Sequence, residues 1–169
     1  MDRQGRFRSR RSTRDRGTYR VTAAFQVAQP AATVWNVLTD YEQIPQFMPE
    51  VRRSIVREHS ASRALVEQEA VARILLFSKR LHLVLEVHEQ GDVIHFCDTA
   101  ADSFTRYEGL WRVHEHDAGT TVTYELTVQP AFTVPPFLFT RLVKRDAEHM
   151  IERLRTEIAL RHGGTRARR

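Results

Sequence analysis

The hydrophobic pattern of the chain changes its period three times. Apolar residues first alternate with more polar ones over residues 19–27, which is the period of a half-buried strand. They then recur every three or four residues over 31–38, just after Pro30, a residue suited to the first turn of a helix. Alternation returns after residue 50, and the helical period returns after Pro130. The pattern predicts a strand, a helical region, several strands and a final helix.

A second short helix is predicted in residues 40–47. Asp40 and Gln43 have the spacing of a capping box, and Pro45 limits the helix to little more than one turn. The stretch also holds three large apolar residues of the kind that a chain normally buries, Ile44, Phe47 and Met48. We interpret this segment as the closure of one end of an internal cavity.

Six further strands are predicted after the helical region. Their ranges are 51–58, 64–76, 79–88, 93–98, 104–115 and 120–128. Most of the breaks between them are short and rich in turn-forming residues, which indicates antiparallel hairpins. Because no Gly or Pro lies between Ala64 and His88, and a strand of that length would be unusual, we place a turn near Phe77 and Ser78.

The last predicted element is a long amphipathic helix over 136–161. Gly163 suits its end, and the helix would be about 39 Å long at 1.5 Å per residue. A single antiparallel sheet with one long helix must curl around that helix to bury both apolar faces. The predicted class is α+β, with about seven antiparallel strands wrapped around the C-terminal helix. The space between them is either filled by side chains or left as a pocket for an apolar ligand.

Charge divides the chain into a body and two basic tails. A length of 169 residues with 41% hydrophobic content suits one domain. The net charge is +5. Seven arginines and two aspartates give residues 1–17 a charge of +5, and four arginines from Arg161 onward add +4. The segment between the tails therefore carries −4. We expect a disordered Arg-rich tail at 1–17, a folded domain at 18–161 and a basic tail at 162–169.

Several classes of protein are disfavoured by composition. The first tail lacks the apolar run of a secretory signal, and no stretch approaches the roughly 20 apolar residues of a membrane span. Cys97 is the sole cysteine, which excludes an internal disulfide and multi-cysteine metal sites. We expect a cytoplasmic protein without specific DNA binding, in which the tails could contact anionic membrane or ribosome.

Four segments together resemble a known superfamily. They are VAQPAATVWNVLTDYEQIPQFMPEV at 27–51, YEGLWRV at 107–113, GTTVTYEL at 119–126 and the helix that begins VPPFLFTRLVKRD. In these segments the chain is similar to the START-like (SRPBCC) helix-grip proteins, and especially to their polyketide cyclase/dehydrase and coenzyme Q-binding branch. This resemblance covers 18–161. It implies a hydrophobic cavity between the curved sheet and the C-terminal helix, which holds lipids, quinones, polyketides or similar molecules.

The residues expected to line such a cavity are mostly aromatic. On the strand 104–115, Tyr107, Gly109 and Trp111 share one face, and we expect that face to point inward. The candidate ligand-binding residues are Trp35, Ile44, Phe47, Met48, Phe77, Phe96, Tyr107, Trp111, Tyr124, Phe137 and Met150. Tyr107 and Tyr124 are the best inward polar groups and are weak candidates for catalysis.

Other titratable residues are interpreted as surface groups. Glu67 and Glu69 could form a carboxylate pair, but an outer-face arrangement with Arg53 or Arg57 is favoured. His82 shares a strand with an inward apolar row and is expected to point outward. The His114-x-His116 pair lies at a charged hairpin end, which disfavours a metal site. We find no phosphate loop, nucleophile elbow or His-Glu-x-x-His motif, and expect no cofactor and no metal.

The stretch RILLFSKR at 73–80 has two interpretations. Its four apolar residues are flanked by cations, as in tips that touch anionic membrane or partner surfaces. The same apolar residues could instead fold over the mouth of the cavity.

Three classes of function follow from these patterns. The first and favoured class is a non-catalytic binder or carrier of a hydrophobic small molecule such as a lipid, quinone or polyketide. The second is a polyketide cyclase, aromatase or dehydratase that acts mainly by positioning its substrate. The third is a ribosome- or partner-binding module that uses the basic tails.

Overall fold

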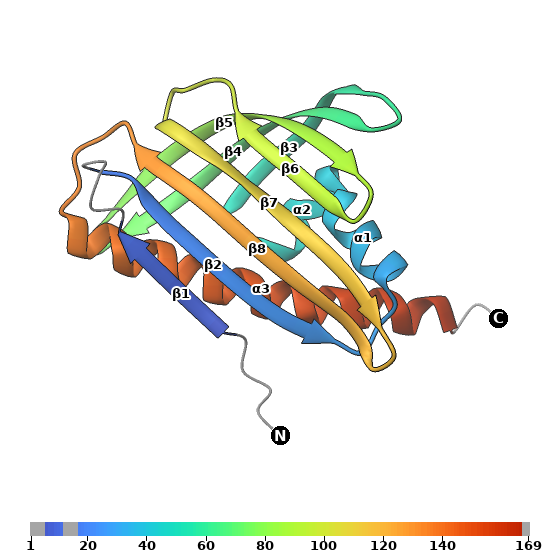
Figure 1. Cartoon of the computed structure of the whole chain (residues 1–169). Coiled ribbons are helices and arrows are strands. Elements are labelled where there is room, and N and C mark those ends of the chain that lie inside the picture. Colours follow the sequence, from blue (N-terminus) through green and yellow to red (C-terminus); the bar gives the residue numbers. More distant parts are fainter. Residues whose placement is uncertain (1–5, 12–16, 167–169) are drawn as a thin grey trace.

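In the computed structural model, which describes residues 6–11 and 17–166, eight strands form one antiparallel sheet (Figure 1). The strands are β1 (Arg6–Arg11), β2 (Tyr19–Val27), β3 (Val51–His59), β4 (Arg63–Ile74), β5 (Phe77–Gln90), β6 (Val93–Asp98), β7 (Phe104–His116) and β8 (Gly119–Pro130). Their order in the sheet is β1-β2-β8-β7-β6-β5-β4-β3, so the sheet stays open, with β1 and β3 at its edges. The long helix α3 (Pro136–Arg166) lies along one face of this sheet (Figure 1). The helix-grip arrangement predicted from the sequence is confirmed.

The short helices between β2 and β3 also form where the sequence predicts them. Helix α1 (Ala31–Thr39) begins after Pro30 without a side-chain cap, and buries Val34, Val37 and Leu38. A 3₁₀ turn, η1 (Tyr41–Gln43), leads into the single-turn helix α2 (Ile44–Phe47). In Figure 1 these elements lie beside the sheet, near the C-terminal half of α3.

The predicted capping box at Asp40 and Gln43 does not form. Asp40 makes no side-chain hydrogen bond to the helix that follows it. Its carboxylate instead accepts a hydrogen bond from the guanidinium of Arg161 on α3, with Nη1 2.7 Å from Oδ2. This contact joins two groups of opposite charge, which makes it a strong, charge-assisted hydrogen bond. The side chain therefore fastens the α1–η1 junction to α3.

One hairpin turn lies two residues before its predicted position. β4 and β5 are joined at Leu75 and Leu76, and not at Phe77 and Ser78, with Ile74 opposite Phe77 in the register. Leu75 adopts a φ of 51°, in the left-handed region that glycine normally occupies. A sequence pattern offers no glycine or asparagine to indicate this turn.

Strand β1 lies within the segment predicted to be a disordered tail. Residues 6–11 pair antiparallel with β2, from Arg6 opposite Ala24 to Arg11 opposite Tyr19. The edge of β2 presents unpaired backbone N–H and C=O groups, so an added strand gains hydrogen bonds without needing an apolar sequence. The remaining parts of that predicted tail, residues 1–5 and 12–16, lie outside the described residues.

Helix α3 is longer than predicted. It continues past the expected end at Arg161 and through Gly163 and Gly164 to Arg166. Extension of an existing helix adds one hydrogen bond for each residue ordered, so a long helix can continue through weak helix formers. The predicted basic tail at 162–169 is thus helical as far as Arg166, and residues 167–169 lie outside the described part. Among the described residues, no helix has both the length and the apolar content needed to cross a bilayer.

The core lies between the inner face of the sheet and α3. Burial alternates strictly along β8, where Val122, Tyr124, Leu126 and Val128 point inward. The buried residues of α3 are spaced by three to five positions along one side of the helix; they are Phe139, Leu142, Ala147, Ile151, Leu154 and Ile158.

Gly109 on β7 makes room for an aromatic ring. It pairs with Phe96 on β6, and a Cβ atom at this position would lie 2.6 Å from Cζ of Phe96 and 2.1 Å from the backbone oxygen of Glu125. Both distances are shorter than any normal contact. The absence of a side chain therefore lets the Phe96 ring cross over the neighbouring strand.

We expect Gly109→Ala to destabilise the protein by about 1–3 kcal/mol, because the added methyl group meets a backbone atom that cannot move away. Chemical denaturation followed by circular dichroism measures this change. Gly163→Ala is the matched control, since nothing lies within 4 Å of its Cβ position and alanine favours the helix. A Gly109→Ala variant as stable as the wild-type protein would contradict this account of the β6–β7 pair.

Candidate functional site

An internal cavity of about 280 Å³ lies between the sheet, α3 and the segment from α1 to α2. The helical elements contribute Val37, Leu38, Tyr41, Ile44, Phe47 and Met48, and α3 contributes Asp146, Met150, Arg153 and Leu154. The sheet contributes Val51, Val66, Gln68, Leu85, Val87, Ile94, Phe96, Tyr107, Trp111 and Tyr124, and Glu50 lies just before β3. The sequence left open whether the space between the sheet and α3 is filled by side chains or forms a pocket. The structure contains a pocket.

The proline-interrupted segment closes one end of this cavity, as predicted. Ile44, Phe47 and Met48 all line it, and Met48 is buried. The backbone N–H of Met48 donates to the carbonyl of Ile44 at 2.8 Å, and the N–H of Val51 donates to that of Met48 at 2.9 Å. Pro45 lies in the first turn of α2, the helix ends at Phe47, two residues before Pro49, and β3 begins at Val51. The segment thus presents apolar side chains inward from a fixed backbone.

Tyr41 supplies a polar group at the same end. Its hydroxyl donates a hydrogen bond to Oε1 of Glu89, 2.7 Å away. Burial, and then the hydrogen bond and negative charge of Glu89, raise the pKa of Tyr41 well above its usual range. The phenol is therefore a neutral donor that is already engaged. Sequence analysis did not assign Tyr41 to the site, although its place between two short helices could have indicated it.

Four aromatic residues line the opposite side. They are Phe96, Tyr107, Trp111 and Tyr124, all predicted from strand alternation. The Trp111 and Tyr124 rings are 4.4 Å apart between centroids, and Phe96 lies 6.0 Å from Tyr107 and 6.3 Å from Tyr124. These separations are typical of packed aromatic pairs, which hold one another in place.

The two tyrosines on this side are hydrogen-bond donors and poor bases. Burial raises the pKa of Tyr107 to about 12, and burial also raises the pKa of Tyr124 well above its usual value. The two hydroxyl groups also affect each other's pKa, to a smaller extent than burial does. Both phenols therefore stay protonated at neutral pH. They can orient or polarise a bound molecule but cannot readily remove a proton from it.

The cavity reaches solvent at a charged mouth between α3 and the start of β3. Arg153 of α3 forms an ion pair with Glu50, and both side chains are partly exposed. Asp146 and Gln68 lie on the same lining. Arg153 is not among the residues predicted for the site, because its partner lies 103 residues away. No local pattern indicates such a pair.

Eight of the eleven predicted ligand-binding residues line the cavity, and their contact with a ligand stays a prediction. The other three are Trp35, Phe77 and Phe137. Trp35 packs against the core from a different face of α1. Phe77 and Phe137 are 59% and 65% exposed, so they belong to the surface of the molecule.

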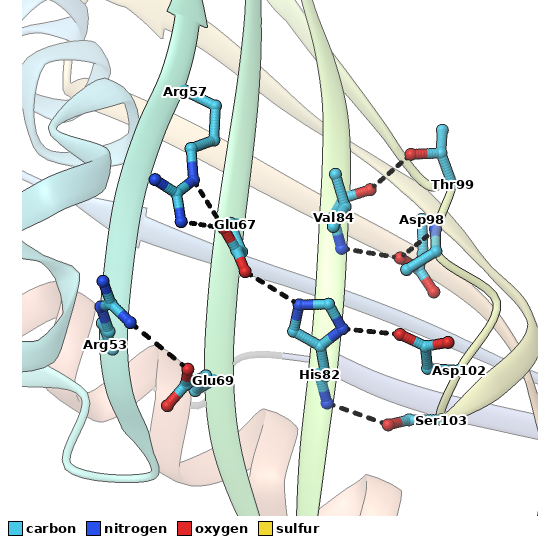
Figure 2. Close-up of polar contacts among 11 residues, drawn as sticks. Arg53, Arg57, Glu67, Glu69, His82, Val84, Asp98, Thr99, Asp102 and Ser103 are labelled. Atoms are coloured by element: carbon cyan, nitrogen blue, oxygen red, sulfur yellow. Dashed lines mark hydrogen bonds and ion pairs between the residues drawn. The ribbon is translucent and has the colours of Figure 1, made fainter.

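The remaining polar candidates form a network on the outer face of the sheet. Figure 2 shows Arg57, Glu67 and His82 in a row across β3, β4 and β5, with Asp102 next to His82 on the loop between β6 and β7. Arg57 pairs with Glu67 at 2.5 Å, and His82 contacts Oε1 of Glu67 at 3.1 Å through Nε2 and Oδ2 of Asp102 at 2.7 Å through Nδ1. The outward positions predicted for Glu67 and His82 are confirmed, and the carboxylate-pair alternative is not supported.

His116 of the His114-x-His116 pair makes a contact within the β7–β8 hairpin. Nε2 of His116 lies 3.1 Å from the hydroxyl of Thr121 across the β7–β8 hairpin. Within the part of the chain that the structure describes, no three His, Cys, Asp or Glu side chains come together in a group that could hold a metal ion.

A curved antiparallel sheet that encloses an apolar cavity against a long C-terminal helix defines a START-like domain. Residues 27–155 match the model of the family described as polyketide cyclase / dehydrase and lipid transport. The chain belongs to this family. No curated protein matches it.

Solved structures of low sequence identity share the fold. A START superfamily protein from Mycobacterium smegmatis is 20% identical, with a TM-score of 0.70, over 83% of this chain and 97% of that one. The Zhui aromatase/cyclase from Streptomyces sp. R1128 is 17% identical, with a TM-score of 0.73, over 85% and 95% of the two chains. A STAR-related lipid transfer protein from Xanthomonas axonopodis is 15% identical, with a TM-score of 0.69, over 90% and 98%.

The contacts of the outer-face network lead to a prediction about the pKa of His82. Hydrogen bonds from His82 to Asp102 and then to Glu67 raise the pKa of the imidazole, so its titration by NMR should show a midpoint above 6.5. A raised pKa means that protonated His82 stabilises the fold below about pH 6.5, and this contribution is lost as the pH rises through the folded-state pKa.

Asp102→Asn should lower the His82 pKa, because it removes the carboxylate that makes the largest contribution. Asp117→Asn, in the exposed β7–β8 turn, serves as the control and should leave the His82 titration unchanged. An unaltered midpoint in Asp102→Asn would show that the two side chains do not interact in solution.

Proposed function

We propose that the protein binds a hydrophobic small molecule in the cavity and carries it without chemical change. The observation that supports this is the character of the lining. Among the described residues, those that line the cavity include no histidine, lysine or cysteine. The phenols that do line it have raised pKa values, and the charged residues lie at the mouth. Such a site favours apolar ligands. Its carboxyl groups are those of Glu50 and Asp146, and burial raises the pKa of Asp146, so these two are the acid–base groups that a catalytic role would have to use.

The size of the cavity limits the ligand. At about 280 Å³ it lies near the lower end of the roughly 300–1,000 Å³ found for small-molecule sites. A compact ring system or a single acyl chain suits this volume better than a two-chain lipid. Lipid, quinone and polyketide-like molecules are the proposed classes. Their polar ends would lie at the Glu50–Arg153 pair, where the cavity meets water.

Ligand binding is tested by native mass spectrometry of the freshly purified protein, followed by titration with a medium-chain fatty acid, a short-chain quinone and an aromatic polyketide. Trp111 lines the cavity, so its fluorescence reports occupancy. We expect at least one of these probes to bind in a one-to-one complex. A bare protein that binds none of the three would remove the support for a carrier.

A matched pair of variants tests whether the ligand binds in the cavity. Leu85 points into the cavity from β5, whereas its neighbour Val84 does not line it. Leu85→Trp should fill the space and weaken probe binding at least about tenfold, while Val84→Trp should leave it nearly unchanged. Thermal melts of both variants check that they fold. Equal probe affinity in the two variants would place the ligand elsewhere.

A second candidate function is a cyclase, aromatase or dehydratase on a polyketide-like substrate. It is favoured by the family to which the chain belongs and by the hydroxyl groups of Tyr107 and Tyr124 in the cavity. In such an enzyme these groups would polarise a carbonyl as hydrogen-bond donors while the cavity holds the chain folded for reaction. The third candidate, a ribosome-binding module, relies on the Arg-rich ends, most of which lie outside the described residues.

Tyr124→Phe separates the first two candidates. In a carrier, loss of one hydrogen bond should weaken ligand binding by no more than about tenfold. In an enzyme, product formation from a poly-β-keto substrate should fall by about 10²–10⁴ at saturating substrate, with binding much less affected. Trp35→Phe, which alters an aromatic side chain away from the cavity, is the control. Measurable turnover by the wild-type protein that collapses in Tyr124→Phe alone would overturn the carrier proposal.

A further inference from the structure

The β4–β5 turn exposes large apolar side chains that no part of the described chain covers. Leu75 is 73% exposed, Leu76 is completely exposed and Phe77 is 59% exposed. Ile74, immediately before them, is buried. The alternative in which this segment folds over the cavity mouth is wrong, because none of the three exposed residues lines the cavity. Their exposure costs stability in water, so it calls for another explanation.

A fourth exposed apolar residue lies at the same end of the molecule. Phe137, in the first turn of α3, is 65% exposed. Figure 1 shows the start of α3 next to the ends of β4 and β5. Two contacts support this proximity: Nζ of Lys79 lies 4.7 Å from the ring centre of Phe132, just before α3, and Nη2 of Arg145 donates to the carbonyl of Arg73 at 2.9 Å. We name Leu75, Leu76, Phe77 and Phe137 the apolar tip.

Positive charge surrounds the apolar tip. The hairpin contributes Arg73, Lys79 and Arg80, and the first turns of α3 contribute Arg141, Lys144 and Arg145. Only two carboxylates, Asp146 and Glu148, lie in the same two segments, 73–80 and 141–148. Phe137, Arg141 and Lys144 recur every three or four residues, so they share one face of the helix. This end is strongly cationic, whereas the segment between the two basic ends of the chain carries a net negative charge.

We propose that the apolar tip and its ring of cations dock on the surface of an anionic lipid membrane. Leucine and phenylalanine side chains insert into the interface between head groups and acyl chains, while lysine and arginine remain among the negatively charged head groups. Each such cation adds attraction to an anionic surface. Lys144 and Arg145 are paired with Glu148 and Asp146, which leaves Arg73, Lys79, Arg80 and Arg141 as the excess positive charge of the two segments. A few apolar residues provide only shallow burial, so the attachment is reversible.

Docking through the apolar tip would bring the mouth of the cavity close to the membrane. Arg145 fixes the base of the hairpin to α3, and the next residue, Asp146, lines the cavity near its mouth. A membrane bound at the tip therefore lies close to the opening through which an apolar ligand would enter or leave. This last step rests on the proposed carrier function, whereas docking itself does not.

Docking is tested by sedimentation of the full chain with phosphatidylcholine vesicles, with and without phosphatidylserine, at physiological salt. We expect binding to the anionic vesicles only. Leu76→Ser/Phe77→Ser should lower the partition coefficient at least about tenfold, because it removes two inserted side chains. Arg73→Gln/Arg80→Gln should lower it to a similar extent on anionic vesicles. All four residues are exposed, so both variants should retain the wild-type thermal stability.

Matched controls separate the tip from other surfaces. Leu160→Ser removes an exposed leucine near the other end of α3, and Arg52→Gln/Arg112→Gln removes two exposed cations on β3 and β7. Both should bind vesicles as the wild-type protein does. The cavity-filling variant Leu85→Trp should also bind vesicles normally, so failure of docking and failure of ligand binding are distinguishable.

Three results would overturn the docking proposal. One is an absence of binding to anionic vesicles by the wild-type chain. Another is binding that survives unchanged in Leu76→Ser/Phe77→Ser, which would assign it to other parts of the chain. The third is a wild-type oligomer in sedimentation velocity that the same variant converts to monomer, which would show that a second copy of the chain covers the tip.

Discussion

The packing of α3 against the inner face of the sheet is the contact on which the cavity depends. Near its start, the ring of Phe139 lies 4.6 Å from that of Tyr19 on β2. Near its end, Ile158 is fully buried and Arg161 is bonded to Asp40. Between these attachments Asp146, Met150 and Arg153 line the open space. The helix is therefore held in place on both sides of the open space.

This arrangement also determines which chemistry the cavity can perform. The space is lined by apolar and aromatic side chains from a rigid sheet, and its phenols are kept neutral by burial. Charge enters only where α3 meets β3, so a bound molecule would meet an apolar interior and a polar exit. Fold alone does not distinguish a carrier from a cyclase, since both occur among proteins of this shape. The predominance of apolar and aromatic side chains in the lining, with no histidine, lysine or cysteine among the described lining residues, is what favours the carrier.

Sequence patterns predicted those features that depend on local spacing. The alternation of β7 and β8 placed Tyr107, Trp111 and Tyr124 on the cavity side, and the prolines placed Phe47 at its end. What could not be predicted depends on partners distant in sequence or on unusual backbone. The pairing of Glu50 with Arg153 joins residues 103 positions apart, and Leu75 takes a left-handed conformation that no sequence rule assigns to leucine. Phe77 begins β5 opposite the buried Ile74 but is itself exposed, which strand alternation does not predict.

The two edges of the open sheet differ in the strand that forms them and in how regular that strand is. On one side β1 covers β2 and becomes the edge. On the other side β3 is irregular, with register shifts between Val51 and Arg53 and between Val56 and Glu58, and most of its polar side chains are exposed. Bulges and charges of this kind prevent a neighbouring molecule from adding a strand to the sheet. A protein at high concentration along a membrane would be protected in this way from edge-to-edge aggregation at β3.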